Sequence, residues 1–161
     1  MKAFLLITML GLLGGGAQAS TNGYDIIITC ENSPGTPTKT IELKLNTFGR
    51  SALLKYQGAE AADSFKVAIR DSQSYNSSSD VWIKNGSTGG QGGTRSLSIS
   101  AHHSETFRVT QFAQFSFELE EDAQGAYFAT SLSMSSGTLE FAESIKEKSV
   151  DLQNMACVIS K

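Results

Sequence analysis

Long apolar stretches and clusters of positive charge are both missing from most of this chain. After the first thirteen residues, no apolar run approaches the roughly 18 residues that a membrane helix requires, so we expect no stable membrane span. Without Lys2, which belongs to the N-terminal segment described below, 12 Lys and Arg stand against 16 Asp and Glu, and the net charge is about −4. Nucleic acids and anionic membrane surfaces attract clustered cations. The sequence therefore argues against both as partners.

Local catalytic signatures are missing as well. The chain contains no Gly-x-Ser-x-Gly elbow and no His-Glu-x-x-His motif. Its Gly-rich stretch is followed neither by Lys nor by a helical pattern, so it lacks the features of a phosphate-binding loop. A Ser/His/Asp triad can still assemble from residues that are distant in sequence. We therefore assign no catalytic, cofactor or metal site and keep an enzyme as the second hypothesis.

The first 19 residues have the pattern of a cleaved secretory signal. Lys2 supplies positive charge, an apolar run follows from residue 3 to 13, and Ala17 and Ala19 stand three and one before the expected cut. The apolar run is too short to span a bilayer. The sequence predicts a signal peptide over residues 1–19, a single domain over residues 20–161, and export to the periplasm or the cell exterior.

The rest of the chain contains only two cysteines, Cys30 near its start and Cys157 near its end. Because exported proteins meet an oxidising compartment, we expect a disulfide between them. Both lie in strand-like segments, so the bond would join the first strand to the last. Adjacent terminal strands would close or nearly close the sheet.

Apolar residues after Ser20 alternate with a period of two, as in half-buried β-strands. Helix signals are confined to short turns at residues 58–63 and 142–147. Strands at this spacing predict an all-β fold of about eight to ten strands, either a closed or partly open antiparallel barrel of lipocalin-like size or a β-sandwich. The predicted strands are residues 24–30, 39–46, 51–56, 65–70, 81–84, 95–101, 106–119, 126–134 and 148–160.

A long strand is predicted from Thr106 onward. Gln111 and Phe112 break its alternation together, which predicts a bulge or bend there. Aromatic residues of this strand and the next share the inward parity, and they either fill the core or surround a ligand cavity. This inward set is Phe107, Phe115, Phe117 and Phe128.

Two low-complexity segments interrupt the alternation, the Ser-rich residues 72–79 and the Gly-rich residues 85–94. Neither can bury apolar surface, and the ordering of such a chain costs entropy. We expect both to be loops, and the second to be a hairpin tip. They either have no role or supply a surface for a partner. The second segment could also cover a bound ligand as a flap.

His102 and His103 are the only histidines and are adjacent in sequence. Neighbours in a strand point to opposite faces, so the pair cannot hold one metal ion in a regular strand geometry. If the strand continues, His103 faces inward with Leu97 and Ile99, and His102 faces solvent with the serines. Structural or surface roles are favoured over a metal site or nucleophilic catalysis.

Acidic residues cluster at Glu118, Glu120, Glu121 and Asp122, where a solvated turn is favoured over a calcium site. Trp82, the single tryptophan, lies in an apolar triplet and is expected to pack in the core or to line a ligand cavity. The candidates for binding are therefore few, and all of them are aromatic or histidine side chains. They are Trp82, His102, His103, Phe115 and Phe128.

The layout is similar to that of small exported barrels and sandwiches such as lipocalin-like or avidin-like binders, without their fingerprint residues. Strands as short as residues 51–56 and 81–84 argue against a small outer-membrane barrel. A fold shared at this level says little about function. The sequence favours non-catalytic binding of a protein partner or a small apolar ligand, and the alternative is a small exported hydrolase or metal-dependent enzyme that uses His102 or His103.

Overall fold

The computed structural model describes residues 23–32, 37–71, 73–74, 76–88, 94–107, 109–138 and 145–161. Within these residues the chain forms ten antiparallel strands and a single 3-10 turn, η1 (Ala61–Asp63). The predicted signal peptide lies outside them. Among the described residues, no helix is long and apolar enough to cross a membrane.

The predicted all-β antiparallel fold is confirmed. All ten strands belong to one sheet in the order β4-β3-β2-β1-β10-β9-β8-β7-β6-β5, so each strand is paired to neighbours in sequence except where β1 meets β10. The strands are β1 (Ile26–Glu31), β2 (Thr40–Asn46), β3 (Ser51–Gln57), β4 (Phe65–Ile69), β5 (Gln73–Ser74), β6 (Ser77–Thr88), β7 (Thr94–Phe107), β8 (Val109–Glu121), β9 (Tyr127–Thr138) and β10 (Lys146–Ser160).

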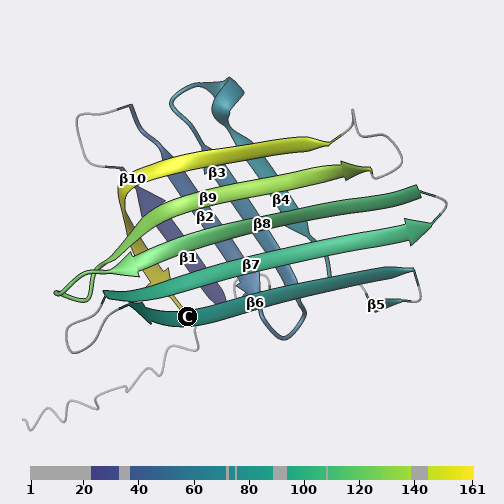
Figure 1. Cartoon of the computed structure of the whole chain (residues 1–161), viewed down its shortest axis with the longest axis horizontal. Helices are drawn as coiled ribbons and strands as arrows, with labels where there is room; N and C mark the ends of the chain where they lie inside the picture. Colours follow the sequence, from purple (N-terminus) through teal and green to yellow (C-terminus); the bar gives the residue numbers. More distant parts are fainter. Residues whose placement is uncertain are drawn as a thin grey trace, which may run out of the picture.

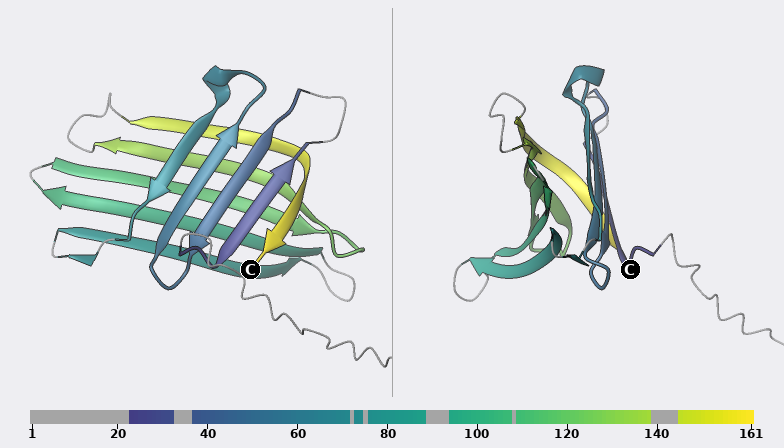
Figure 2. Two further views of the ribbon diagram at one scale, coloured as in Figure 1. Left: turned by 180° about the vertical axis from the view of Figure 1, so that it is seen from behind. Right: turned by 90° about the vertical axis from the view of Figure 1, so that its right-hand side faces the viewer.

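The sheet folds over into two layers (Figures 1 and 2). One layer contains β1 to β4, and the other contains β5 to β9. Strand β10 belongs to both, because its first part pairs with β9 and its last part pairs with β1. The register of β10 against β9 shifts between Asp151 and Met155. Figure 2 shows β10 bending from one layer into the other.

Cys30 and Cys157 form the predicted disulfide. They stand directly opposite each other on β1 and β10, with their Cα atoms 4.1 Å apart. The pairing of the first and last strands does not close the sheet, however, because β1 and β10 are interior neighbours and β4 and β5 are the two edges. Of the architectures expected from the sequence, the protein therefore has an open, two-layered one.

The core lies between the two layers and consists of the inward-pointing residues, which alternate with outward-pointing ones along the strands. In β2 and β3 every second residue is buried, as the period of two predicts. The opposite layer supplies Phe115 and Phe117, which are 3% and 0% exposed, and Tyr56 of β3 is a buried aromatic side chain of the first layer. Other wholly buried side chains are Ile28, Leu43, Leu45, Leu54, Ile99, Leu119 and Leu132.

Several predicted loops belong to strands instead. Residues 85–88 of the Gly-rich segment pair with β7, and residues 77–79 of the Ser-rich segment are the start of β6. Lys146 and Glu147, expected in a helical turn, begin β10. Cross-strand pairing overrides weak local propensity at these positions. Thr94, the last residue of the Gly-rich segment, begins β7, and residues 89–93 lie outside the described residues. The turn expected at residues 58–63 contains η1.

The prediction of one long strand from Thr106 onward is wrong for its first residues. Thr106 and Phe107 end β7, and they pair back onto Thr110 and Val109 of β8. The pairing of β8 continues without a shift at residues 111 and 112, so the predicted bulge is absent there. Both residues lie near the start of β8, where inward and outward side chains need not differ in polarity. The side chain of Phe107 is not among those that the structure describes.

A bulge occurs instead where β8 pairs with β9. Glu118 pairs with Ser131 but the next residue, Leu119, pairs with Ala129, so Thr130 is the extra residue. This residue reverses the parity of the first part of β9. Ala129 consequently faces the core, at 1% exposure, and Phe128 faces outward. The expectation that Phe128 belongs to the inward aromatic set is therefore wrong.

Candidate functional site

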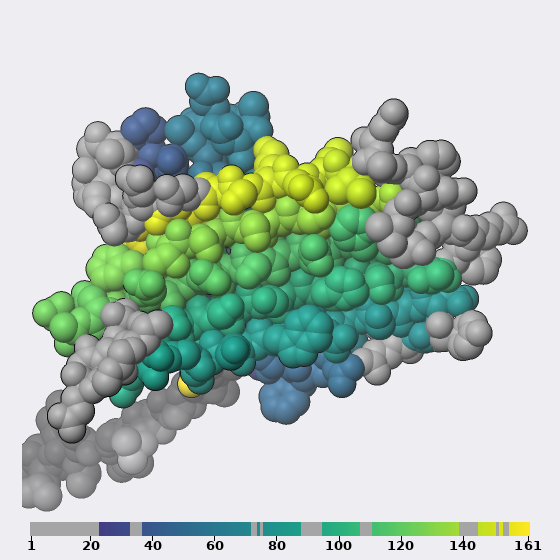
Figure 3. Space-filling model, in the orientation of Figure 1, coloured from purple at the N-terminus to yellow at the C-terminus, as the bar shows by residue number. Residues whose placement is uncertain are grey.

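The outer face of the layer from β6 to β10 carries a row of serine side chains flanked by two rows of polar and charged ones. Pairing across five strands aligns a central row of Trp82, Ser100, Ser116, Ser133 and Ser149. On one side of it lie Asp80, His102, Gln114, Ser135 and Glu147, and on the other side lie Lys84, Ser98, Glu118 and Ser131. We call these three rows the serine face, and the surface turned toward the viewer in Figure 3 is the outer surface of these strands.

A hollow of about 600 Å³ lies on the serine face. The four serines of the central row line it between Trp82 at one end and Glu147 and Lys148 at the other. His102, Gln114 and Ser135 line one long side. The serine side chains are much shorter than those at the two ends, so the row forms the floor of a trough that runs across the strands.

Trp82 is 56% exposed, so the expectation of core packing is wrong. The residues on either side of it, Val81 and Ile83, pack against the core. In an apolar triplet on a strand with one solvated face, the middle residue must point outward. The result is a large aromatic side chain at the end of the hollow.

The other binding candidates are not brought together. His102 lines the hollow, as its predicted outward direction allows. Phe115 borders the hollow, but its side chain is buried in the core. Phe128 is half-buried on the outer face, outside the hollow. His103 faces inward, as predicted, toward a different set of partners.

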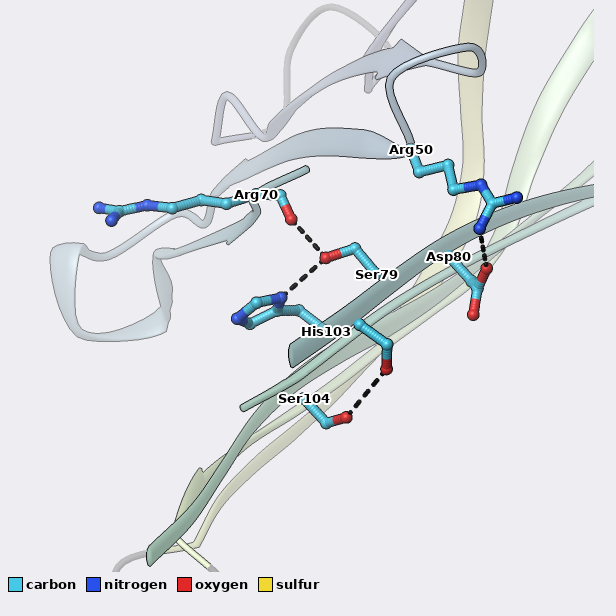
Figure 4. A network of polar contacts seen from close by, with 7 residues as sticks. Arg50, Arg70, Ser79, Asp80, His103 and Ser104 are labelled. Carbon is cyan, nitrogen blue, oxygen red and sulfur yellow. Dashed lines mark hydrogen bonds and ion pairs between the residues drawn. The ribbon is translucent and has the colours of Figure 1, made fainter. Parts of the chain in front are cut away.

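His103 belongs to a polar network at the edge of the core, shown in Figure 4. Its Nδ1 atom lies 2.8 Å from Oγ of Ser79, a wholly buried residue of β6. The hydroxyl of Ser79 donates a hydrogen bond to the backbone carbonyl of Arg70, just after β4. The network therefore connects the two layers of the sheet. Nearby, Arg50 of the turn between β2 and β3 pairs with Asp80 across 3.5 Å.

The hydrogen bond between Ser79 and His103 runs in the wrong direction to activate the serine as a nucleophile. A hydroxyl has one proton, and that of Ser79 is donated to a carbonyl, which can only accept. Nδ1 of His103 must therefore carry a proton and donate to Oγ. A general base needs the opposite arrangement, in which the imidazole accepts the proton of the serine. In this arrangement the contact joins structural elements.

The acidic cluster is divided between several partners. Glu118 accepts a hydrogen bond from Ser131, and Asp122 caps the turn after β8 by accepting from the backbone N–H groups of Gln124 and Ala126. Glu121 lies 3.2 Å from the hydroxyl of Tyr127, and burial and this carboxylate together raise the pKa of Tyr127. Among the residues that the structure describes, no group of three or more His, Cys, Asp and Glu could hold a metal ion.

The charge of the serine face is mainly negative. Asp80, Glu118 and Glu147 lie on it against a single cation of the rows, Lys84. Lys148 also borders the hollow, but its ammonium group is directed to the other layer. It donates to the carbonyl of Ala62 at 2.9 Å and lies 5.6 Å from the centre of the Phe65 ring.

No protein-family model, curated protein or solved structure matches this chain. The geometry of the serine face is thus the basis for a functional assignment. Alternation along the sequence places Ser96, Ser98 and Ser100 on the solvent side with His102, but it does not show the rows. The available signal is the recurrence of serine at every second position in two separate segments, residues 96–100 and 131–135.

Proposed function

We propose that this protein is an exported, non-catalytic binding domain that recognises a macromolecule through the serine face. The observation that carries the proposal is the hollow, because it places an exposed tryptophan beside a row of hydroxyl groups from four neighbouring strands. Rigid strands hold these groups in fixed positions, so little order has to be gained on binding.

Two further features support this proposal. The signal-like residues 1–19 and the disulfide between Cys30 and Cys157 are both typical of exported proteins. The space between the layers is occupied by buried side chains such as Phe115 and Phe117. Recognition on the outside of the sheet is therefore favoured over a small apolar ligand held between the layers.

The proposal can be tested with residues 20–161 immobilised and exposed to an extract of the native cell envelope. Material that the wild-type domain retains should be lost with Trp82→Ala and kept with Val158→Ala, because Val158 is 65% exposed on the layer that does not carry the serine face. Proteins and carbohydrates in the retained fraction are both analysed. Equal retention by all three forms would contradict recognition through this face.

The proposal that the protein is not a catalyst has a separate test. A panel of esterase, glycosidase, peptidase and phosphatase substrates should show no turnover. A robust rate that is abolished by His102→Ala or His103→Ala would overturn the proposal in favour of the enzyme hypothesis.

A further inference from the structure

The shape of the hollow restricts what can bind in it. The central row crosses β6, β7, β8, β9 and β10 through directly paired residues, so its floor runs across the strands and follows the twist of the sheet. With neighbouring strands about 4.8 Å apart, four intervals give a length of about 19 Å. A trough of this length fits an extended chain of linked units better than a compact small molecule.

The chemistry of the floor restricts the ligand further. Each serine of the central row offers one donor and two acceptor positions. His102 and Gln114 add further polar groups along one side. Such a lining matches a ligand that carries many hydroxyl groups, each both donor and acceptor.

A protein partner would find little of what protein interfaces use. The cores of such interfaces are enriched in aromatic residues, Met and Arg and depleted in Ser. The central row contains four serines and one aromatic residue. The single aromatic side chain stands at the end of the row, where it can cover the flat apolar face of one ring of a chain that continues over the serines.

The charges on the serine face argue against a polyanion. Glu118 and Glu147 would repel carboxylate, sulfate or phosphate groups and outnumber Lys84, the one cation of the rows, while Asp80 is paired with Arg50 across 3.5 Å. The ammonium group of Lys148 is directed away to Ala62 and Phe65, so it does not offset this repulsion within the hollow. An uncharged ligand avoids the repulsion entirely.

We propose that the ligand of the serine face is an uncharged, ribbon-shaped glycan chain that lies along the central row with one sugar ring on Trp82. This inference rests on the proposed function and names its ligand class. Flat β-linked chains of glucose or N-acetylglucosamine have apolar ring faces and hydroxyl groups along both edges. They can therefore meet the indole and the serines at once, whereas a helically coiled α-linked chain does not keep successive rings along one extended row.

The single tryptophan makes the hollow directly observable, because all tryptophan fluorescence of the chain comes from Trp82. Cellohexaose and chitohexaose are titrated into residues 20–161 while the emission is recorded, and pelleting with microcrystalline cellulose and chitin is measured in parallel. Maltohexaose tests the coiled geometry and polygalacturonate tests the charge. We expect a saturable emission change with at least one of the first two oligosaccharides and none with the last two.

Two variants locate the binding. Trp82→Ala should weaken pelleting about tenfold or more, the loss typical of truncating a central aromatic contact. Ser116→Leu should also weaken it, because the larger side chain would fill the middle of the floor between Ser100 and Ser133. The matched controls lie on the opposite outer surface, where Val158→Ala and Thr29→Leu alter exposed residues of the β1–β10 pair and should leave pelleting unchanged.

The outcomes separate the ligand class from the site. If neither polysaccharide binds but the envelope extract yields a protein whose retention requires Trp82 and Ser116, the glycan is wrong and recognition by the serine face stands. If polysaccharide binds equally well to Trp82→Ala and Ser116→Leu, the assignment to this face is wrong. If nothing is retained in a manner that depends on these residues, both proposals are overturned.

Discussion

Nδ1 of His103 donates to Oγ of Ser79 across 2.8 Å, and Ser79 in turn donates to the carbonyl of Arg70. This chain of two hydrogen bonds joins β7, β6 and the residue that follows β4, and Ser79 is wholly buried. Serine and histidine are residue types of a catalytic dyad, but here they are hydrogen-bonded at the edge of the core and connect strands.

Removal of the Ser79 hydroxyl should destabilise the fold. Ser79→Ala leaves the Arg70 carbonyl and the His103 donor without this partner in a buried setting, and a loss of about 1–3 kcal/mol in the free energy of unfolding is expected. Urea unfolding followed by circular dichroism measures it.

Ser78→Ala is the matched control. Ser78 is exposed on the outer face, where its hydroxyl lies 3.3 Å from that of Ser104. Its loss should change stability by no more than about 0.5 kcal/mol. Equal effects of the two substitutions would show that the buried network contributes nothing particular.

Reduction of the disulfide should loosen the junction between the layers. The bond joins residues separated by 127 positions, and cross-links of such long loops stabilise by about 2–5 kcal/mol. The oxidised protein and the Cys30→Ala/Cys157→Ala double variant are compared by urea unfolding and by hydrogen exchange. Faster exchange is expected in β1 and the last part of β10, with little change in β7 and β8. Equal unfolding free energies would contradict this prediction.

The sequence was sufficient for the strand content and the disulfide because both follow from local signals. Alternation gives the buried faces of β2 and β3, and two lone cysteines in strand-like segments leave one pairing. The sheet order was not accessible in this way, because it depends on which strands meet at long range. The position of β1 beside β10 in the middle of the sheet, with β4 and β5 at its edges, is such a relationship.

The candidate site was only partly predictable, for a related reason. The outward direction of His102 follows from alternation, but Trp82 was expected inside because hydrophobicity outweighed its parity in the triplet. The rows of serines become visible only when four strands are placed in register, since no single strand shows that Ser100, Ser116 and Ser133 are neighbours. Phe128 was misplaced because the bulge at Thr130 leaves no mark in the sequence.

Stability should fall in acid through Asp25. Partial burial raises the pKa of this carboxyl, but hydrogen bonds from the hydroxyl and the backbone N–H of Thr47 outweigh it, so the pKa lies below its ordinary value of 3.8. A lowered pKa in the folded state gives stability that is complete above the unfolded pKa and is lost as the pH falls through the folded one.

The free energy of unfolding should therefore decline as the pH is lowered below 3.8, and Asp25→Asn should flatten that decline. Thr47→Val removes the hydroxyl donor and keeps the backbone N–H, so it should flatten the decline in part. Urea unfolding at a series of pH values checks both. An unchanged slope in Asp25→Asn would show that this carboxyl makes no contribution.

Phe117 and Phe128 test the bulge in β9. Phe117 is wholly buried, so Phe117→Ala should cost about 3–5 kcal/mol, the usual loss for a buried phenylalanine. Phe128 is half-buried on the outer face, so Phe128→Ala should cost about 1 kcal/mol or less. Unfolding of the two variants in urea gives the comparison. Without the extra residue at Thr130, both phenylalanines would face the core and the two costs would be similar, so comparable losses would contradict the observed register.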